Sequence, residues 1–356
     1  MHIRRATSNY ERWLARTQRL VPADIRRKHR LMRESRFGFF RGSFFRWSQL
    51  WQSWSPELTT APRVAAVGDL HVENFGTWRD YEGRLVWGIN DFDEAWRLPY
   101  TNDLIRLTTS ALLAVEDNAL SLGDAAIAQT ILEGYQAGLE AAGRPLVLAE
   151  HNETLRSLAV ARVREAKDYW TKLESLPALS GGSKMVFRWL RQALPPGSKV
   201  NRWVHRTSGL GSMGRERVAV LADCCGSKVA REAKALAPSA CAWAEGRIRP
   251  TRHWPSFLLK NAVRCLDPSV QIRRGWCIRR LAPDCSRIDL TMLASAGDER
   301  RLLQSMGWET ANVHLASDAR TSILKDLAGR RGKWLLRASR RATTAIEQDY
   351  RLWRGA

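Results

Sequence analysis

The sequence predicts an α+β protein in which a mostly helical body is interrupted by a small β-rich lobe. Two observations support this prediction. Apolar residues recur at helical spacing before residue 195 and again from Asp298 onward, whereas short runs typical of strands occur between about 200 and 290. The length of 356 residues fits one large or two modest domains, and the content of apolar and charged residues is that of a folded chain.

The first 200 residues contain most of the predicted helices. Residues 1–60 look helical and include an aromatic stretch at 37–45, whose large apolar side chains imply burial. Two short apolar runs, 64–67 and 84–89, are predicted strands. Helices are predicted at 103–118, where Thr101 or Asn102 would be the N-cap, and at 124–141, 153–175 and 184–194.

The segment 195–198, Pro-Pro-Gly-Ser, marks a break after which the pattern changes. All six cysteines lie beyond this break without C-x-x-C spacing, and the first residues lack an apolar core followed by a cleavage site. We therefore expect reduced thiols in a cytoplasmic protein, and no membrane span because no stretch approaches ~20 apolar residues. Strands are predicted at 202–205, 217–221, 228–231 and 276–279, and helices at about 256–266 and 298–317.

The charge balance is strongly positive, with 57 Lys and Arg against 36 Asp and Glu and a formal net charge of +21. Such a balance favours acidic partners such as nucleic acid or phosphorylated ligands. However, all but ten of the basic residues are Arg, which fits codon bias, and no block of five occurs. A solvated Arg-rich surface is the favoured interpretation, and nucleic-acid binding is the minority one.

The first candidate site is the loop after the 64–67 strand. Asp69 is followed by Asn74 five residues later, which is the D-x-x-x-x-N spacing of a phosphotransferase catalytic loop. In that role Asp69 would orient an attacking hydroxyl, and the Asn74 carbonyl oxygen would bind Mg²⁺. For the isolated pattern an ordinary turn is the favoured interpretation, because Asp and Asn are also common in turns.

The second candidate site directly follows the 84–89 strand. Asp91 lies where a kinase-like site has its main Mg²⁺ ligand, and Asp93 would be a second ligand or a hydrogen-bond anchor. A capping cluster of acids at a strand end is the competing interpretation. The two interpretations weigh about equally at this point.

The third candidate site is a G-x-G-x-x-G motif at 209–214, with Gly209, Gly211, Ser212 and Gly214 as its nucleotide-binding residues. A dinucleotide-binding unit needs a helix after the last glycine, but the pattern here is strand, turn, strand. This context favours a kinase-like glycine hairpin followed by a strand that carries Lys234. The competing interpretation of Lys234 is a solvated strand lysine.

Taken together, these motifs resemble known families. Residues 69–75 and 91–94, followed by Pro99 and Asp103, resemble the catalytic and metal loops of aminoglycoside phosphotransferases and other small-molecule kinases. More closely, the chain resembles an uncharacterised bacterial family of unknown function. The shared motifs are F-F-R-G at 39–42, G-D-x-H-x-x-N-F-G at 68–76, D-F-D-E at 91–94, G-x-G-S-x-G at 209–214, the strand ending at Lys234 and the segment 276–290.

The resemblance implies a protein-kinase-like fold with two lobes that uses ATP and Mg²⁺. The order of the motifs is unusual, because the catalytic loop precedes the glycine-rich loop by about 140 residues. A circular permutation explains this order. The helix at 298–317 would then precede the catalytic loop in an unpermuted kinase. The predicted parts are a large helical lobe at 1–200, a small nucleotide-binding lobe at 201–290 and C-terminal helices at 291–356.

Two departures from the kinase pattern keep alternatives open. Val67 stands where many small-molecule kinases have His, and Lys234 has no clear acidic partner on a following helix. An inactive nucleotide-binding protein, or an enzyme that transfers a nucleotidyl group, therefore remains an alternative.

Three neighbouring residues are assigned supporting roles. We expect Asp103 to hydrogen-bond the backbone of the catalytic loop and His71 to bond within that loop. Arg41 would either reach a phosphate or pair with an acid across the helical body.

The sequence thus predicts an ATP- and Mg²⁺-dependent phosphotransferase that acts on a hydroxyl of an unknown small-molecule or protein acceptor. Asp69 would orient the nucleophile, Asn74 and Asp91 would hold the metal, and Lys234 would hold phosphates. The alternative is an inactive nucleotide-binding pseudokinase or a basic protein associated with nucleic acid.

Overall fold

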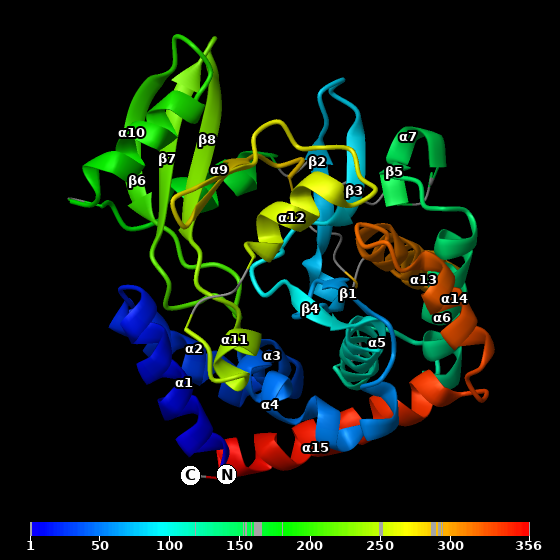
Figure 1. The fold of residues 1–356 in the computed structure, drawn as a ribbon. Helices are drawn as coiled ribbons and strands as arrows, with labels where there is room; N and C mark the ends of the chain where they lie inside the picture. The colour runs from blue at the N-terminus through cyan, green and yellow to red at the C-terminus, as the bar shows by residue number, and fades with distance from the viewer. Residues whose placement is uncertain are drawn as a thin grey trace.

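The computed structural model confirms the predicted α+β class (Figure 1). It describes residues 2–355 except 118, 152, 154, 158, 160–165, 180, 249–251, 286–289, 291, 292 and 294. Parts of the predicted helix 153–175 and of the segment 276–290 therefore lie outside the described residues. In the described part of the chain, no helix is both long and apolar enough to cross a membrane.

The N-terminal region is helical, as its aromatic and apolar spacing predicts. Its elements are α1 (Ile3–Thr17), α2 (Pro22–Glu34), α3 (Arg36–Gly42), α4 (Phe44–Trp54) and the 3-10 turn η1 (Pro56–Leu58). Further helices of the body are α5 (Tyr100–Glu116), α6 (Asp124–Glu140), α7 (Leu148–His151), α11 (Ala240–Ala244), α12 (Trp254–Asn261), α13 (Ala296–His314), α14 (Arg320–Ala328) and α15 (Trp334–Arg354).

Two small antiparallel sheets lie inside this body and carry the candidate loops at their ends. β1 (Arg63–Ala66) pairs with β4 (Trp96–Pro99), and β3 (Leu85–Ile89) pairs with both β2 (Phe75–Arg79) and β5 (Leu146–Val147). A 3-10 turn, η2 (Val72–Asn74), joins the β1 loop to β2. The sequence did not predict β2 or β4, which are short and interrupted by Gly76 or ended by Pro99.

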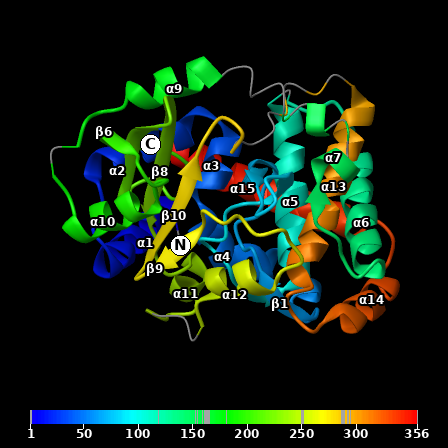
Figure 2. The same ribbon diagram turned by 90° about the horizontal axis from the view of Figure 1, so that it is seen from above.

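The β-rich segment forms one five-stranded antiparallel sheet in the order β6-β7-β8-β10-β9. Its strands are β6 (Lys199–His205), β7 (Arg217–Cys224), β8 (Ser227–Ala235), β9 (Gln271–Arg273) and β10 (Trp276–Leu281). One face packs on α10 (Lys184–Ala193) through Val186 and Leu190, and the other packs on α9 (Ala166–Glu174) through Leu173. We call this sheet with α9 and α10 the small lobe. Figures 1 and 2 place the small lobe at one side of the molecule and α6 and α13 at the other.

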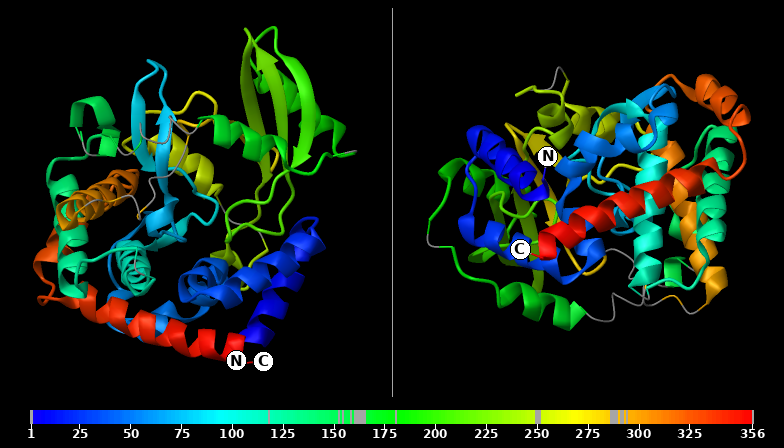
Figure 3. Two further views of the ribbon diagram at one scale, coloured as in Figure 1. Left: turned by 180° about the vertical axis from the view of Figure 1, so that it is seen from behind. Right: turned by 90° about the horizontal axis from the view of Figure 1, so that it is seen from below.

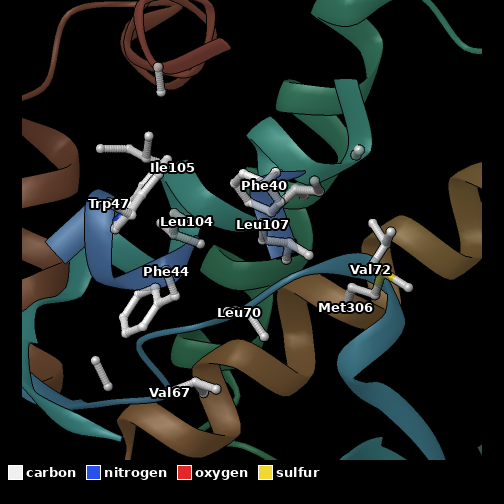
Figure 4. Packing of buried hydrophobic residues seen from close by; sticks show 14 of the residues in the cluster. Phe40, Phe44, Trp47, Val67, Leu70, Val72, Leu104, Ile105, Leu107 and Met306 are labelled. Carbon is white, nitrogen blue, oxygen red and sulfur yellow. The ribbon is translucent and has the colours of Figure 1, made fainter. Parts of the chain in front are cut away.

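Helix α5 forms the centre of the body, since every residue from Tyr100 to Ala114 is buried. Its apolar residues Leu104 and Leu107 belong to the same core as Phe40, Phe44 and the loop residue Leu70 (Figure 4). Burial of one such side chain contributes about 1.5–3 kcal/mol to folding, so this packing fixes the loop after β1 firmly against α5.

The two ends of the described chain lie side by side. Arg4 in the first turn of α1 donates a hydrogen bond from Nη2 to the carbonyl oxygen of Trp353 in the last turn of α15, at 3.1 Å. The left view of Figure 3, from behind, shows the two termini next to each other.

Candidate functional site

A single cavity of about 890 Å³ is lined by residues of both the body and the small lobe. The loops of the body contribute Asp69 and Asp91, and the small lobe contributes Lys234. Of the predicted site residues, the cavity is lined by Arg41, Asp69, His71, Asn74, Asp91, Asp93, Gly209, Gly211, Ser212 and Lys234. Gly214 and Asp103 do not line it. The structure therefore brings together motifs that are more than 100 residues apart in the chain.

Lys234 on β8 points at the acidic loop that follows β3. Its Nζ lies 3.2 Å from Oδ1 and 3.1 Å from Oδ2 of Asp91, and it also forms a salt bridge with Asp93. The Lys234 side chain is only 5% exposed, whereas that of Asp91 is 35% exposed. The acidic partner that the sequence did not reveal is thus the D-F-D-E loop itself.

The two carboxylates beside Lys234 differ in their proton affinity. Burial alone would raise the pKa of Asp91, but the Lys234 ammonium, a hydrogen bond with Asp93 and the charge of Arg279 together outweigh burial and hold this pKa well below its usual value. Burial and the negative charge of Asp91 together raise the pKa of Asp93 to about 6. Arg215, which follows the glycine-rich loop, contacts Asp93 at 3.2 Å and Glu94 at 2.7 Å. Arg215 thus connects the glycine-rich loop to the D-F-D-E loop.

Asp69 is held by an arginine that the sequence analysis did not identify. The fully buried Arg106 of α5 donates from Nε and Nη2 to Oδ1 of Asp69. The guanidinium carbon of Arg106 also lies 4.0 Å from the ring centre of Phe40 and 4.8 Å from that of Phe44. Burial raises the pKa of the Asp69 carboxyl, and Arg106 opposes this shift.

Asp103 holds the backbone at the start of the Asp69 loop. Its carboxylate accepts hydrogen bonds from the amides of Val67 at 2.6 Å and Gly68 at 3.0 Å. His314 at the end of α13 lies 3.1 Å from the same carboxylate. Gly68 has a φ of +80°, and a Cβ there would lie 2.3 Å from the carbonyl oxygen of Glu94, so only glycine fits.

The end of the same loop is closed by a local hydrogen-bond pair. Oδ1 of Asn74 accepts from the amide of His71 at 2.9 Å, and Nδ1 of His71 accepts from the amide of Glu73 at 3.2 Å. Arg41 forms a salt bridge with Glu73. Asn74 and His71 are therefore engaged in holding η2 in place, and Arg41 pairs with an acid across the body.

The glycine-rich loop lies directly over Asp69. A Cβ on Gly211 would be 3.1 Å from Oδ2 of Asp69, and the carbonyl oxygen of Gly211 accepts a hydrogen bond from Nζ of Lys28 at 3.1 Å. Gly209 and Gly214 have φ values of +73° and +99°, which favour glycine. Gly214 faces Ile25 of α2 rather than the cavity, since a Cβ there would lie 2.2 Å from Ile25 Cδ1.

A second charged group lies two residues before Lys234. The fully buried carboxylate of Glu232 pairs with Arg206, with Arg217 at 3.1 Å and with Arg279 at 3.0 Å. These three arginines outweigh burial and hold the pKa of Glu232 well below its usual value. We call Glu232 with Arg206, Arg217 and Arg279 the arginine cluster. Glu232 is therefore fully occupied and is not the partner of Lys234.

The site offers oxygen ligands for a hard cation, but few of them. No group of three or more His, Cys, Asp or Glu residues in the described part of the chain has a metal-binding arrangement. Asp93 is occupied by Lys234 and Arg215, whereas Asp91 is partly exposed to the cavity. Asp91 with the Asn74 carbonyl is the donor set that remains. Mg²⁺ commonly takes one or two protein oxygens and completes its shell with phosphates and water.

Two residues that hold the site together, Arg106 and Arg215, could have been recognised in the sequence. Arg106 follows Asp103 by three residues on the buried face of a helix, where a charge needs a partner. Arg215 directly follows the last glycine of the G-x-G-x-x-G motif. An arginine inside an otherwise apolar or glycine-rich segment therefore indicated a buried ion pair in both places.

Part of the chain is similar to a known protein family. Residues 19–175 match the model of a family described as uncharacterized protein conserved in bacteria (DUF2252). This segment includes the Asp69 and Asp91 loops and ends before the glycine-rich loop. The resemblance to a bacterial family of unknown function is therefore supported for this part of the chain. No curated protein and no solved structure matches the chain.

Proposed function

We propose that this protein transfers a phosphoryl group from ATP to a hydroxyl of an acceptor, in a kinase-like fold whose sequence is circularly permuted. The observation that carries the proposal is the contact of Lys234 with Asp91 at 3.1 Å across one cavity that Asp69 and the glycine-rich loop also line. Residues 143 positions apart in the chain meet there. Phosphoryl transfer needs this combination of cationic, acidic and glycine-rich groups around one triphosphate.

The residues fit a magnesium ion that arrives with the nucleotide. Asp91 would hold it, because its carboxylate is exposed to the cavity and stays ionised beside Lys234. Asn74 lines the same cavity, although its oxygen already accepts one hydrogen bond from His71. The metal would neutralise charge on the phosphates when bound. Lys234 and the loop amides at 209–212 would position those phosphates.

Asp69 is suited to orient the attacking hydroxyl. Arg106 binds Oδ1 of Asp69 and thereby fixes the side chain, whereas Oδ2 accepts no hydrogen bond from the described residues. This free oxygen lies beside Gly211, on the cavity side. Burial raises the pKa of the carboxyl, which makes it a better proton acceptor than an exposed aspartate.

Two features support the permutation. The turn after α13 lies beside β1, since the amide of Ala65 donates to Oγ of Ser317 at 2.8 Å. In an unpermuted chain such a helix would lead into the catalytic loop. The contact between Arg4 and Trp353 also brings the two ends together, which a permuted chain requires.

The test is a thermal-shift titration with Mg-ATP, combined with an assay of ATP consumption. Ligand that binds only the folded state raises the melting temperature, by a few degrees at about 100 times Kd. We expect this rise for the wild type and for Asp223→Asn, an exposed control on β7, and not for Asp91→Asn. No shift at millimolar Mg-ATP, or an equal shift in Asp91→Asn, would contradict the proposal. Binding without consumption in the presence of candidate acceptors would indicate a nucleotide-binding pseudokinase.

A further inference from the structure

We infer that the arginine cluster is a phosphate-binding subsite on the small-lobe wall of the cavity, separate from the Lys234 and Asp91 centre. The inference rests on the geometry and charge of the cluster and does not depend on phosphoryl transfer. The subsite would bind a phosphoryl group of whatever ligand occupies the cavity.

The cluster is built by three neighbouring strands. Glu232 on β8 is directly opposite Arg279 on β10 in the strand register, and Arg217 begins β7 on the other side. Arg206 follows β6, and its amide donates to the carbonyl oxygen of Arg217 at 3.2 Å. Three of the four side chains project from one sheet, and this backbone bond joins Arg206 to it, so their positions are fixed before any ligand binds.

The cluster carries more positive charge than its internal partner can neutralise. Three guanidinium groups surround one carboxylate, so the cluster by itself has a net charge of +2. On the opposite wall the balance is reversed. Four carboxylates there, those of Asp69, Asp91, Asp93 and Glu94, pair with three cations: Arg106, Arg215 and, reaching across from β8 of the small lobe, Lys234. An unneutralised cationic group inside a cavity attracts an anion more strongly than it would in water.

Two of the arginines present unused donors to the cavity. Arg206 and Arg279 line the cavity and have side chains that are 20% and 28% exposed. In the described part of the chain, Arg279 uses only Nε and the Arg206 side chain only Nη1 in hydrogen bonds. The remaining guanidinium N–H groups have the planar, forked geometry that binds phosphate oxygens in pairs.

The surrounding residues also suit an anion. Tyr169 of α9 also lines the cavity, near Arg206 and Arg279. Burial raises the pKa of its hydroxyl, and the charges of the two arginines only partly oppose this shift. Its hydroxyl stays protonated and is therefore a further donor. Arg217 donates from Nη2 to Oγ of Ser212 at 2.9 Å, which connects the cluster to the glycine-rich loop. A phosphate on the cluster would thus lie beside the loop without displacing Lys234 from Asp91.

The test measures binding of inorganic pyrophosphate to the full chain by isothermal titration calorimetry. We compare the wild type with Arg279→Gln and with Arg273→Gln, an exposed arginine on the adjacent strand β9 that carries the same charge change. Loss of a paired, charge-assisted contact should weaken pyrophosphate binding about tenfold or more in Arg279→Gln. Arg273→Gln should stay within about twofold, because its side chain lies outside the cavity. Arg206→Gln should weaken pyrophosphate binding as Arg279→Gln does. If both variants show this loss, a folding defect of one variant does not explain it.

Three results would overturn the inference. They are no pyrophosphate binding by the wild type at low millimolar concentration, equal binding by Arg279→Gln and wild type, and an equal loss in Arg273→Gln. The last result would mean that the overall charge of +21 attracts the anion without a defined site.

A parallel titration with Mg-ATP identifies the source of the phosphate and separates the two proposals. If Arg279→Gln weakens both pyrophosphate and Mg-ATP, the subsite binds the phosphates of the nucleotide. If it weakens pyrophosphate alone, the subsite binds a phosphorylated second ligand. If the wild type binds pyrophosphate through Arg279 but never binds Mg-ATP, the proposed phosphotransferase function fails and the subsite stands.

Discussion

The two walls of the cavity have opposite charge balances. On the body side, Asp69 pairs with Arg106, whereas Asp91, Asp93 and Glu94 share Lys234 and Arg215, so the acids outnumber the cations that pair with them. On the small-lobe side, one carboxylate, Glu232, holds three arginines. A buried ion pair adds little net stability but is costly to break, so the charges on both walls contribute less to folding than their number suggests. Under the two proposals above, a cation would bind to the body wall and an anion to the small-lobe wall.

The largest effect should come from breaking the pair on the body wall. Arg106→Met leaves the carboxylate of Asp69 buried without its counter-ion and removes the contacts with Phe40 and Phe44. We expect a loss of about 3–5 kcal/mol in the free energy of unfolding, measured by urea denaturation. The double variant Asp69→Asn with Arg106→Met should recover much of this loss, because no charge is then left unpaired. A loss below about 1 kcal/mol in the single variant would show that Asp69 does not depend on Arg106.

The matching change on the small-lobe wall is Glu232→Gln. This change keeps the size of the side chain but leaves three arginines without their carboxylate, so we expect a loss of about 3 kcal/mol. Added phosphate should restore part of the stability by binding to the folded state, and should stabilise the variant more than the wild type. Thermal denaturation with increasing phosphate measures both effects. Equal stabilisation of the two proteins would mean that phosphate binds elsewhere.

The pH dependence of stability tests the coupling of Asp93 to Asp91. The pKa of Asp93 is raised to about 6 from 3.8, so the folded state binds a proton that the unfolded state releases between these values. This group therefore lowers stability as the pH rises from about 4 to 6, by roughly 2–3 kcal/mol. In Asp93→Asn this part of the decrease should disappear, because the amide has the shape of the neutral carboxyl and does not ionise. An unchanged slope between pH 4 and 6 would contradict the raised pKa.

The smallest effect on stability, but a clear effect on activity, is expected for Gly211→Ala. The new Cβ would lie 3.1 Å from Oδ2 of Asp69, in the space that the attacking hydroxyl needs. We expect turnover to fall about tenfold or more while stability changes by less than about 1 kcal/mol. Gly181→Ala, where a Cβ meets no atom within 4 Å, is the control. Full turnover in Gly211→Ala would place the acceptor away from this side of Asp69.

The helical body and the strands of the small lobe could be predicted because their apolar residues follow the periods of helix and strand. β7 was predicted from 217–221 and β8 as a strand that ends at Lys234, and in the structure β7 continues to Cys224 and β8 to Ala235. β2 was missed because pairing with β3, rather than its own composition, makes Phe75–Arg79 a strand.

The candidate site could be predicted only in part. The local spacing of Asp69, Asn74 and Asp91 was visible in the sequence. The partners Lys234 and Arg106 were not assigned to them, because these contacts span 143 and 37 residues and depend on how the chain folds back. The arginine cluster could not be predicted either, because its members come from four separate places in the chain and meet only in the folded structure.

The contact between Arg4 and Trp353 makes the chain suitable for backbone cyclisation. A short linker between the first turn of α1 and the last turn of α15 would close the polypeptide into a ring and reduce the entropy of its unfolded state. The ring could then be cut at Gly181, an exposed position before α10. In the resulting gene the small-lobe sheet and the glycine-rich loop would be translated before the Asp69 and Asp91 loops. If this permuted protein still folds, the contacts between the two walls of the cavity do not depend on the order of translation.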